Sequence, residues 1–220
     1  MQRLQSRLLD VPDDFPGADF ENVEKKVQAR FPEHAHSRRF VGAWAAVAYR
    51  FMAMAQYDEK FTRELLQYGA SPGPMLRYEQ ERDIFGFLNS GCSAVDAFSF
   101  GMFALGAMLK PSAFPLRESN EWKVNPGTCH FAYSSAFTGD TIVSALQLTT
   151  KNGDPNWVGF SNFRNVLTHR AAPARDFPRG IISRVDIVLD KETTSSRRRQ
   201  VAGLLGKLLA ASNSFVQRHC

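Results

Sequence analysis

The sequence predicts an all-α fold, a helical bundle of about five or six helices with a long central connection and at most a short β embellishment. Apolar residues recur at spacings of three and four along most of the chain, which is the period of an α-helix with one buried face. Gly and Pro gather in short breaks between these runs. The 220 residues are 44% hydrophobic and 22% charged, which excludes wholesale disorder, a collagen-like sequence and a coiled coil.

The N-terminal part is expected to stand apart from the main domain. Acidic residues, Pro and Gly interrupt any period in residues 1–35, so we expect an N-terminal arm that is loosely structured except for a short helix near Phe20 to Arg30. Residues 36–220 are expected to form a single helical bundle domain.

Two long helical patterns follow. The first starts at Ser37, a good N-cap residue, and continues to Tyr68, which predicts one long helix or two in tandem. Gly and Pro residues at positions 69–74 then break the chain. The second pattern, Ile84 to Leu109, is apolar on several faces, so it should form the central buried helix and end at Pro111.

The next stretch has weaker patterns. Residues 111–137 show no clear period and predict a long connection with short extended pieces around His130 to Tyr133. A helix should begin near Thr138 or Asp140 and stop at Asn152-Gly153, because Asn and Gly favour the end of a helix.

Three elements are predicted in the last part of the chain. Asp154-Pro155 should start a helix that runs to about Arg170, because Asp caps free amides and Pro is tolerated in the first turn. Ile181 to Leu189 alternates well enough for a short strand. A final helix should start near Ser195 or Ser196, with one apolar face at Val201, Leu204, Leu205, Leu208 and Phe215.

Positive charge is concentrated in the second half of the chain. The net charge is +5, and residues 111–220 hold 14 Lys and Arg against 8 Asp and Glu, whereas residues 1–110 hold 13 against 14. Arg outnumbers Lys by 19 to 8, and guanidinium groups suit phosphate recognition. A polyanionic partner is therefore expected, although the run Arg197 to Arg199 also fits a solvated helix start.

Several classes of protein do not fit the sequence. The longest charge-free apolar stretch, Ala97 to Leu109, is shorter than the roughly 18 residues of a membrane span, so no membrane partner is expected. The first ten residues lack the apolar core of a secretory signal and the cysteines lack CxxC spacing, which predicts a cytoplasmic protein with reduced thiols. Pairs such as Cys129-His130 lack metal-site spacing and no glycine-rich nucleotide loop is present, so we expect neither metal nor cofactor.

One segment carries a pattern with specific chemistry. Arg164, Asn165 and His169 fall in the helix expected after Pro155, where a spacing of four lets the Asn165 amide orient the His169 imidazole. Arg164 lies about 140° round this helix from His169. Arg and His together suit cleavage of RNA without a metal, because His transfers a proton to or from the 2′-hydroxyl or the leaving oxygen and Arg stabilises the phosphoryl charge.

This segment resembles the Arg-x(4–6)-His motif of the HEPN (higher eukaryotes and prokaryotes nucleotide-binding) superfamily, in which a polar residue, often Asn, follows the Arg. The resemblance implies an all-α homodimer in which the motif helices of two protomers face each other across a composite active site. It implies a metal-independent endoribonuclease in which Arg164 binds phosphate or stabilises the transition state, Asn165 positions His169, and His169 is the general acid and base. Many members act in toxin–antitoxin, abortive-infection or other defence systems, so RNA and an antitoxin protein are the expected partners.

Four further residues are candidates for this site. Thr168 follows Arg164 by four positions and shares its helix face. Arg170 and Arg175 are candidates for binding RNA phosphates, although both also suit a solvated surface. Asp96 interrupts the apolar helix, and its carboxylate either pairs across helices with the motif or faces solvent at the rim.

Two functions stay open at this point. The motif predicts endoribonuclease activity by 2′-OH transesterification, which leaves a 2′,3′-cyclic phosphate. Other HEPN proteins are non-catalytic modules that bind a nucleotide, nucleic acid or a protein partner, and the same Arg cluster would serve such a module by its charge alone.

Overall fold

Helices make up most of the chain that the structure describes. The structure is a computed structural model and describes residues 1–169 and 189–220. The all-α class predicted from the sequence is confirmed. The elements, in chain order, are β1 (Gln2–Leu4), β2 (Leu9–Val11), α1 (Gly17–Arg30), α2 (Ser37–Tyr68), α3 (Pro74–Leu109), the 3-10 turn η1 (Glu121–Lys123), α4 (Pro126–Ala136), α5 (Thr141–Gln147), α6 (Pro155–His169) and α7 (Glu192–His219).

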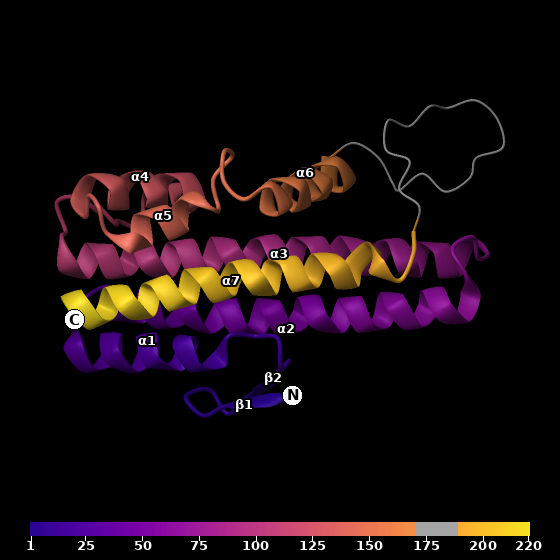
Figure 1. The fold of residues 1–220 in the computed structure, drawn as a ribbon, viewed down its shortest axis with the longest axis horizontal. Helices are drawn as coiled ribbons and strands as arrows, with labels where there is room; N and C mark the ends of the chain where they lie inside the picture. Colours follow the sequence, from indigo (N-terminus) through magenta and orange to yellow (C-terminus); the bar gives the residue numbers. More distant parts are fainter. Residues whose placement is uncertain (170–188) are drawn as a thin grey trace.

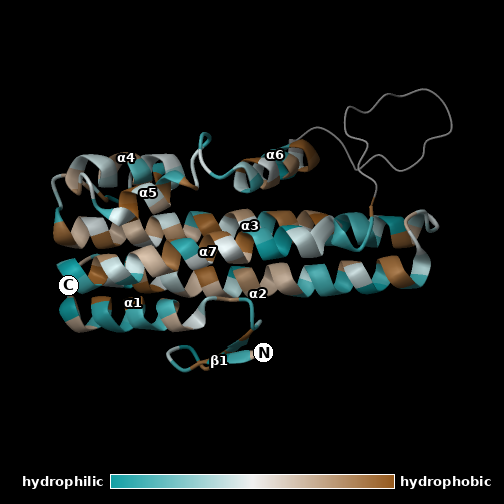
Figure 2. Cartoon of the chain, viewed as in Figure 1, coloured by the Kyte–Doolittle hydropathy of each residue, from teal (hydrophilic) through white to brown (hydrophobic). Residues whose placement is uncertain are grey.

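The bundle is built around α3. Figure 1 shows α2 running beside α3, α7 lying along both, α4 over one end of α3 and α6 over its middle, while α5 packs on α4 and α7. α3 is long and apolar enough to cross a membrane, but 78% of its most apolar 18-residue window is buried inside the bundle. Figure 2 shows hydrophobic residues along most of α3 and more polar ones towards the tip of the α2–α3 hairpin. α3 is therefore the core helix of the bundle, as the sequence predicted.

The first 35 residues are more ordered than expected. The helix predicted near Phe20 to Arg30 is present and begins at Gly17. The segment before it forms a small antiparallel hairpin, in which Gln2 pairs with Val11 and Leu4 with Leu9. The expectation of a loose arm was wrong here because Leu4 and Val11 bury their side chains in the main core, and strands this short leave no clear period in the sequence.

Trp44 ties α1 to α2. Its indole is fully buried, and Nε1 donates a hydrogen bond to the backbone carbonyl of Phe20 at 3.0 Å. The rings of Phe20 and Phe40 stack on it, with centroids 5.5 and 5.1 Å away. This contact explains why α1 belongs to the bundle, because a buried indole N–H needs a partner and α1 provides it.

The two long helices match their predictions closely. α2 is one continuous helix whose cap residue is His36, so Ser37 is its first helical residue and not its cap. It ends at Tyr68 and is followed by the capping residue Gly69, whose φ of +74° is a conformation that suits glycine. α3 begins at Pro74 and ends at Leu109, before Pro111.

The region expected to be a long connection contains α4. Asn125 caps this helix: its Oδ1 accepts from the Thr128 amide at 3.0 Å, while the Thr128 hydroxyl accepts from the Asn125 amide at 2.8 Å. The extended pieces expected at His130 to Tyr133 were wrong, because Cys129 and Tyr133 form a buried helical face. The Tyr133 hydroxyl donates a hydrogen bond to the Met102 carbonyl at 2.8 Å, which joins α4 to α3.

The later elements follow the sequence with shifted ends. α5 starts after its cap Asp140 but ends at Gln147, earlier than expected. α7 begins at Glu192, before the expected start, and buries the predicted apolar face. Almost all of the strand expected at Ile181 to Leu189 lies outside the described residues.

Gly91 lets α6 lie close to α3. A Cβ atom at this position would lie 2.6 Å from Phe160 Cζ and 2.8 Å from Met54 Sδ, distances that real Cβ atoms do not show. Phe160, on α6, is buried and meets the Phe87 ring edge to face at 5.9 Å. The place of α6 on the bundle therefore depends on the absence of a side chain at residue 91.

We expect Gly91→Ala to destabilise the protein by about 1 kcal/mol, because overpacking that costs about 1–3 kcal/mol outweighs a gain in helix propensity of about 1 kcal/mol. The matched control is Gly203→Ala in α7, where a Cβ meets nothing within 4 Å and the propensity gain should stand alone. Urea unfolding of both variants measures the difference. Equal stabilisation by the two substitutions would contradict this account of the α3–α6 contact.

Candidate functional site

The start of α6 is fixed by Asp154. Its carboxylate Oδ1 accepts from the amides of Asn156 at 2.9 Å and Trp157 at 3.4 Å, and Pro155 is the first helical residue. Lys207 of α7 places its Nζ 3.6 Å from the same carboxylate. The helix start predicted from Asp154-Pro155 is confirmed, and the ion pair with Lys207 links it to α7.

Three aromatic side chains fix the rotation of α6 about its axis. Trp157, Phe160 and Phe163 are buried. The indole Nε1 of Trp157 donates to the Thr149 carbonyl at 2.9 Å, and the guanidinium carbon of Arg197 lies 4.7 Å from the centroid of the Phe163 ring. A helix anchored at these points cannot turn without exposing apolar surface or losing a buried hydrogen bond.

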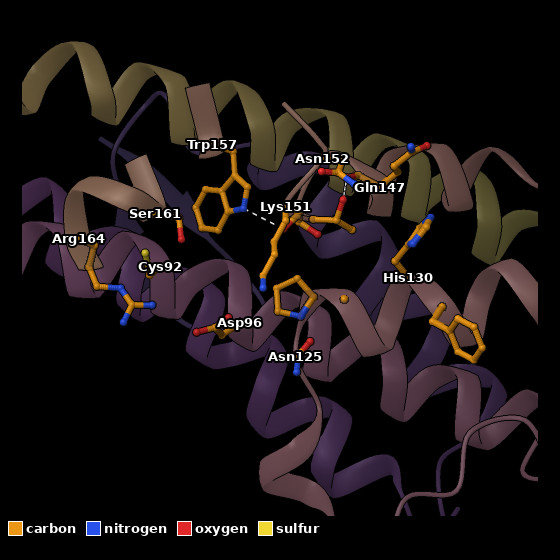
Figure 3. A pocket seen from close by; sticks show the side chains of 15 residues that line it. Cys92, Asp96, Asn125, His130, Gln147, Lys151, Asn152, Trp157, Ser161 and Arg164 are labelled. Carbon is orange, nitrogen blue, oxygen red and sulfur yellow. Dashed lines mark hydrogen bonds between the residues drawn. The ribbon is translucent and has the colours of Figure 1, made fainter. Parts of the chain in front are cut away.

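With α6 held at this rotation, the Arg164 side chain faces a pocket. The pocket has a volume of about 690 Å³ and lies between α3, α4, the α5–α6 loop and α6. Trp157, Ser161 and Arg164 all line it, as expected for residues four and three apart on one helix face. Figure 3 shows its principal polar side chains, which include Cys92, Asp96, His130, Lys151, Ser161 and Arg164.

Arg164 is half-buried and incompletely partnered. Its Nε is buried and has no hydrogen-bond partner among the described residues. Burial raises the pKa of the Cys92 thiol to about 11, and the Arg164 guanidinium opposes this shift through its hydrogen bond and its charge. Cys92 is therefore a neutral thiol near pH 7, and it does not balance the charge of Arg164.

Asp96 is the only acidic residue that lines this pocket in the part of the chain that the structure describes. Desolvation raises the pKa of its carboxyl, while the charges of Arg164 and Arg50 act in the opposite direction. No ion pair within 4.0 Å joins Asp96 to Arg164 among the described residues. No carboxylate of the described residues lies at ion-pair distance from the Arg164 guanidinium, so an anionic ligand in the pocket has access to it.

A second cation lines the pocket from the α5–α6 loop. Lys151 is exposed, and no hydrogen bond or ion pair joins its ammonium group to another described residue. His130, on α4, is half-buried, with its Nε2 3.2 Å from the Ser134 hydroxyl. In Figure 3 Arg164 lies at one end of the pocket, Lys151 near its middle and His130 towards the other end.

The structure brings some of the predicted residues together and not others. Arg164 and Asp96 line the same pocket. Asn165 is exposed and does not line it, whereas the Thr168 hydroxyl is buried without a partner among the described residues. His169 is the last residue of α6, and the structure does not describe its side chain.

The register of α6 also separates the motif residues. The pocket-lining positions on α6 fall within about 60° of one another, and the backbone position of His169 is about 110° from the centre of that face. Arg170 and Arg175 lie outside the described residues, so their predicted phosphate-binding role stays a prediction.

Sequence reasoning missed Lys151 and His130. Lys151 lies in the turn where a helix was expected to stop, and turns of this kind carry no signal of what they face. His130 stands beside Cys129 in the sequence, and that pair lacks metal-site spacing, so the sequence gives no sign that His130 lines a pocket. Among the described residues no group of three or more His, Cys, Asp and Glu side chains has the arrangement of a metal site.

The arrangement as a whole suits an anion. Two cationic side chains from different elements line one pocket with a single carboxylate, that of Asp96, among the described residues. Comparisons with known proteins found no matching family model, no matching curated protein and no matching solved structure. The resemblance to the HEPN superfamily stays a prediction, carried by Arg164, Asn165 and His169.

Proposed function

We propose that the protein is a metal-independent endoribonuclease that cleaves RNA by 2′-OH transesterification, with Arg164, Asn165 and His169 as its working residues. One observation carries most of the proposal. α6 is continuous through the whole motif, and its aromatic anchors hold Arg164 in a pocket without a charge partner at ion-pair distance among the described residues. A guanidinium held in this way is available for a phosphate oxygen.

Arg164 has the role of stabilising the charge of the reacting phosphate. It is half-buried, so its charge acts in a medium less polar than water, and its position is set before any ligand arrives. The neutral Cys92 beneath it does not compete with a phosphate for the guanidinium. Both features leave the guanidinium available to the reacting phosphate, where its charge would stabilise the extra negative charge of the transition state.

The proposed site needs two protomers. Arg164 and His169 lie about 140° apart around α6, so one helix does not present both to the same phosphate. Asn165 is exposed on the flank between them. We therefore keep the homodimer that the resemblance implies, with His169 of the second copy approaching the phosphate held by Arg164 of the first.

The biological setting follows from the resemblance. We propose a defence or toxin–antitoxin role, with RNA as substrate and an antitoxin protein as a further partner, in the cytoplasm. The second candidate is a non-catalytic HEPN-like module that binds nucleic acid or a nucleotide, and the charged pocket at Arg164 favours it as the alternative.

Purified protein should cleave an end-labelled mixed RNA pool in EDTA and leave 2′,3′-cyclic phosphate ends. His169→Ala should lower the rate by about 10²- to 10⁴-fold, the usual contribution of a general acid or base. Arg164→Ala should lower the rate and also weaken RNA binding, because it removes a phosphate contact. Gel analysis of products, with circular dichroism to check the fold, measures these effects.

Two outcomes would count against the ribonuclease. Cleavage that requires a divalent metal and survives His169→Ala would exclude the proposed mechanism. Salt-sensitive binding without cleavage, lost in Arg164→Ala but kept in His169→Ala, would favour the non-catalytic module.

Asp96→Asn should raise RNA affinity by about two- to fivefold at low salt, because it removes a negative charge from the Arg164 pocket. It should also raise the melting temperature at pH 7 relative to wild type, more than at pH 3. The pKa of Asp96 is raised in the fold, so the folded state holds this proton more tightly, and the protein loses stability as pH rises from the unfolded pKa of 3.8 through the higher pKa of the folded state.

Paired melts at both pH values and anisotropy titrations test this prediction. Glu33→Gln, an exposed carboxylate outside the pocket, is the matched control. A melting-temperature difference that does not change with pH would show that Asp96 ionises without penalty in the folded protein.

A further inference from the structure

The part of the pocket away from Arg164 has its own chemistry. It is lined by the start of α4 and by the α5–α6 loop, and these residues are outside the Arg-Asn-His motif. The whole pocket, at about 690 Å³, is in the size range of small-molecule sites, about 300–1,000 Å³. It is therefore larger than one phosphate group requires.

Lys151 gives this part of the pocket a positive charge. It lies between Arg164 and His130 in the view of Figure 3. Its ammonium group has no partner among the described residues, so no bond within the protein has to break before a ligand binds. The two cations lie along one pocket, an arrangement that suits successive phosphates of a strand.

Uncharged groups complete the surface. Gln147 and Asn152 line the same pocket, and their amides make no side-chain hydrogen bond to another described residue. Amides that both donate and accept suit base edges and ribose hydroxyls. Phe131 also lines the pocket and is 74% exposed, an unusual state for a large aromatic side chain and one that suits stacking of a base.

We propose that this region, defined by Phe131, Gln147, Lys151 and Asn152, is a subsite for one nucleotide of single-stranded RNA next to the phosphate at Arg164. Lys151 contacts the neighbouring phosphate, Phe131 stacks on the base, and the amides of Gln147 and Asn152 contact its edge or the ribose. The subsite rests on the proposed ribonuclease function, since it places the nucleotide beside the phosphate to be cleaved.

The test uses the full chain with His169→Ala, so that RNA is bound without being cut. A fluorescein-labelled single-stranded oligoribonucleotide of eight residues is titrated by anisotropy at several KCl concentrations. Lys151→Ala should weaken binding about 5- to 20-fold and reduce the slope of log Kd against log [KCl] by about 0.7, the contribution of one single-strand phosphate contact. Phe131→Ala should weaken binding about tenfold with an unchanged slope, because stacking carries no charge.

Lys25→Ala is the matched control, an exposed lysine of α1 that is outside the pocket and should change neither affinity nor slope. Lys151 and Phe131 are both exposed, so neither substitution should impair folding, and thermal melts check this. If Lys151→Ala binds no worse than Lys25→Ala, or Phe131→Ala binds like its parent, the subsite is wrong.

Two further experiments distinguish a free nucleotide from an RNA strand as the ligand, and the subsite proposal from the ribonuclease proposal. Calorimetry with 5′-AMP tests whether the subsite binds a free nucleotide instead. The strand assignment would be overturned if AMP bound more tightly than the oligonucleotide and Lys151→Ala weakened the binding of AMP alone. Wild-type cleavage assays run in parallel. Cleavage that is indifferent to Lys151→Ala and Phe131→Ala would refute the subsite alone, whereas binding that needs both side chains without any cleavage would refute the ribonuclease alone.

Discussion

The fold depends on the need to cover α3 on all sides. This helix of 36 residues buries apolar side chains around most of its circumference, so no single neighbour can shield it. α2 and α7 cover two sides along much of its length, while α4 and α6 share another. Close approach is possible because α3 offers glycines at the contacts, where Gly91 accepts Phe160 and Gly106 accepts the ring of Phe114. The burial of α3 therefore sets the position of every other long helix.

The pocket forms because two separate helices, α4 and α6, cover one side of α3. α4 and α6 lie over the same side of α3 at different points along it, and the loop that joins α5 to α6 passes between them. Cys92 and Asp96, one helical turn apart on α3, line the pocket that remains. A carboxylate is tolerated at that point because α3 is not fully covered there. The loop contributes Lys151, so the part of α3 that is not fully covered is lined by a carboxylate and by cationic side chains.

Periodicity predicted the parts of the fold that depend on local pattern. The spacing of apolar residues located α2, α3 and α7, and Asp154-Pro155 located the start of α6. α4 was missed although Asn125 and Thr128 form a capping box, because the short helix shows a weak apolar period. Arg164 was found because it belongs to a local motif, whereas Lys151 and Phe131 join it only through the packing of distant segments, which no window of sequence contains.

The rotation of α6 decides what chemistry the motif can support. Trp157, Phe160 and Phe163 hold the helix at one angle, so Arg164 faces the pocket and Asn165 faces solvent. Turning the helix by about 100° to bring Asn165 inward would expose those rings, and each buried aromatic side chain is worth several kcal/mol, about 3–5 for loss of a Phe or Trp. A rearrangement within one chain would therefore cost several kcal/mol, whereas the approach of a second helix from solvent leaves these rings buried. The aromatic anchors thus support the proposal of a site completed across two protomers, in which the pocket would bind the RNA strand and the exposed flank of α6 would meet the partner.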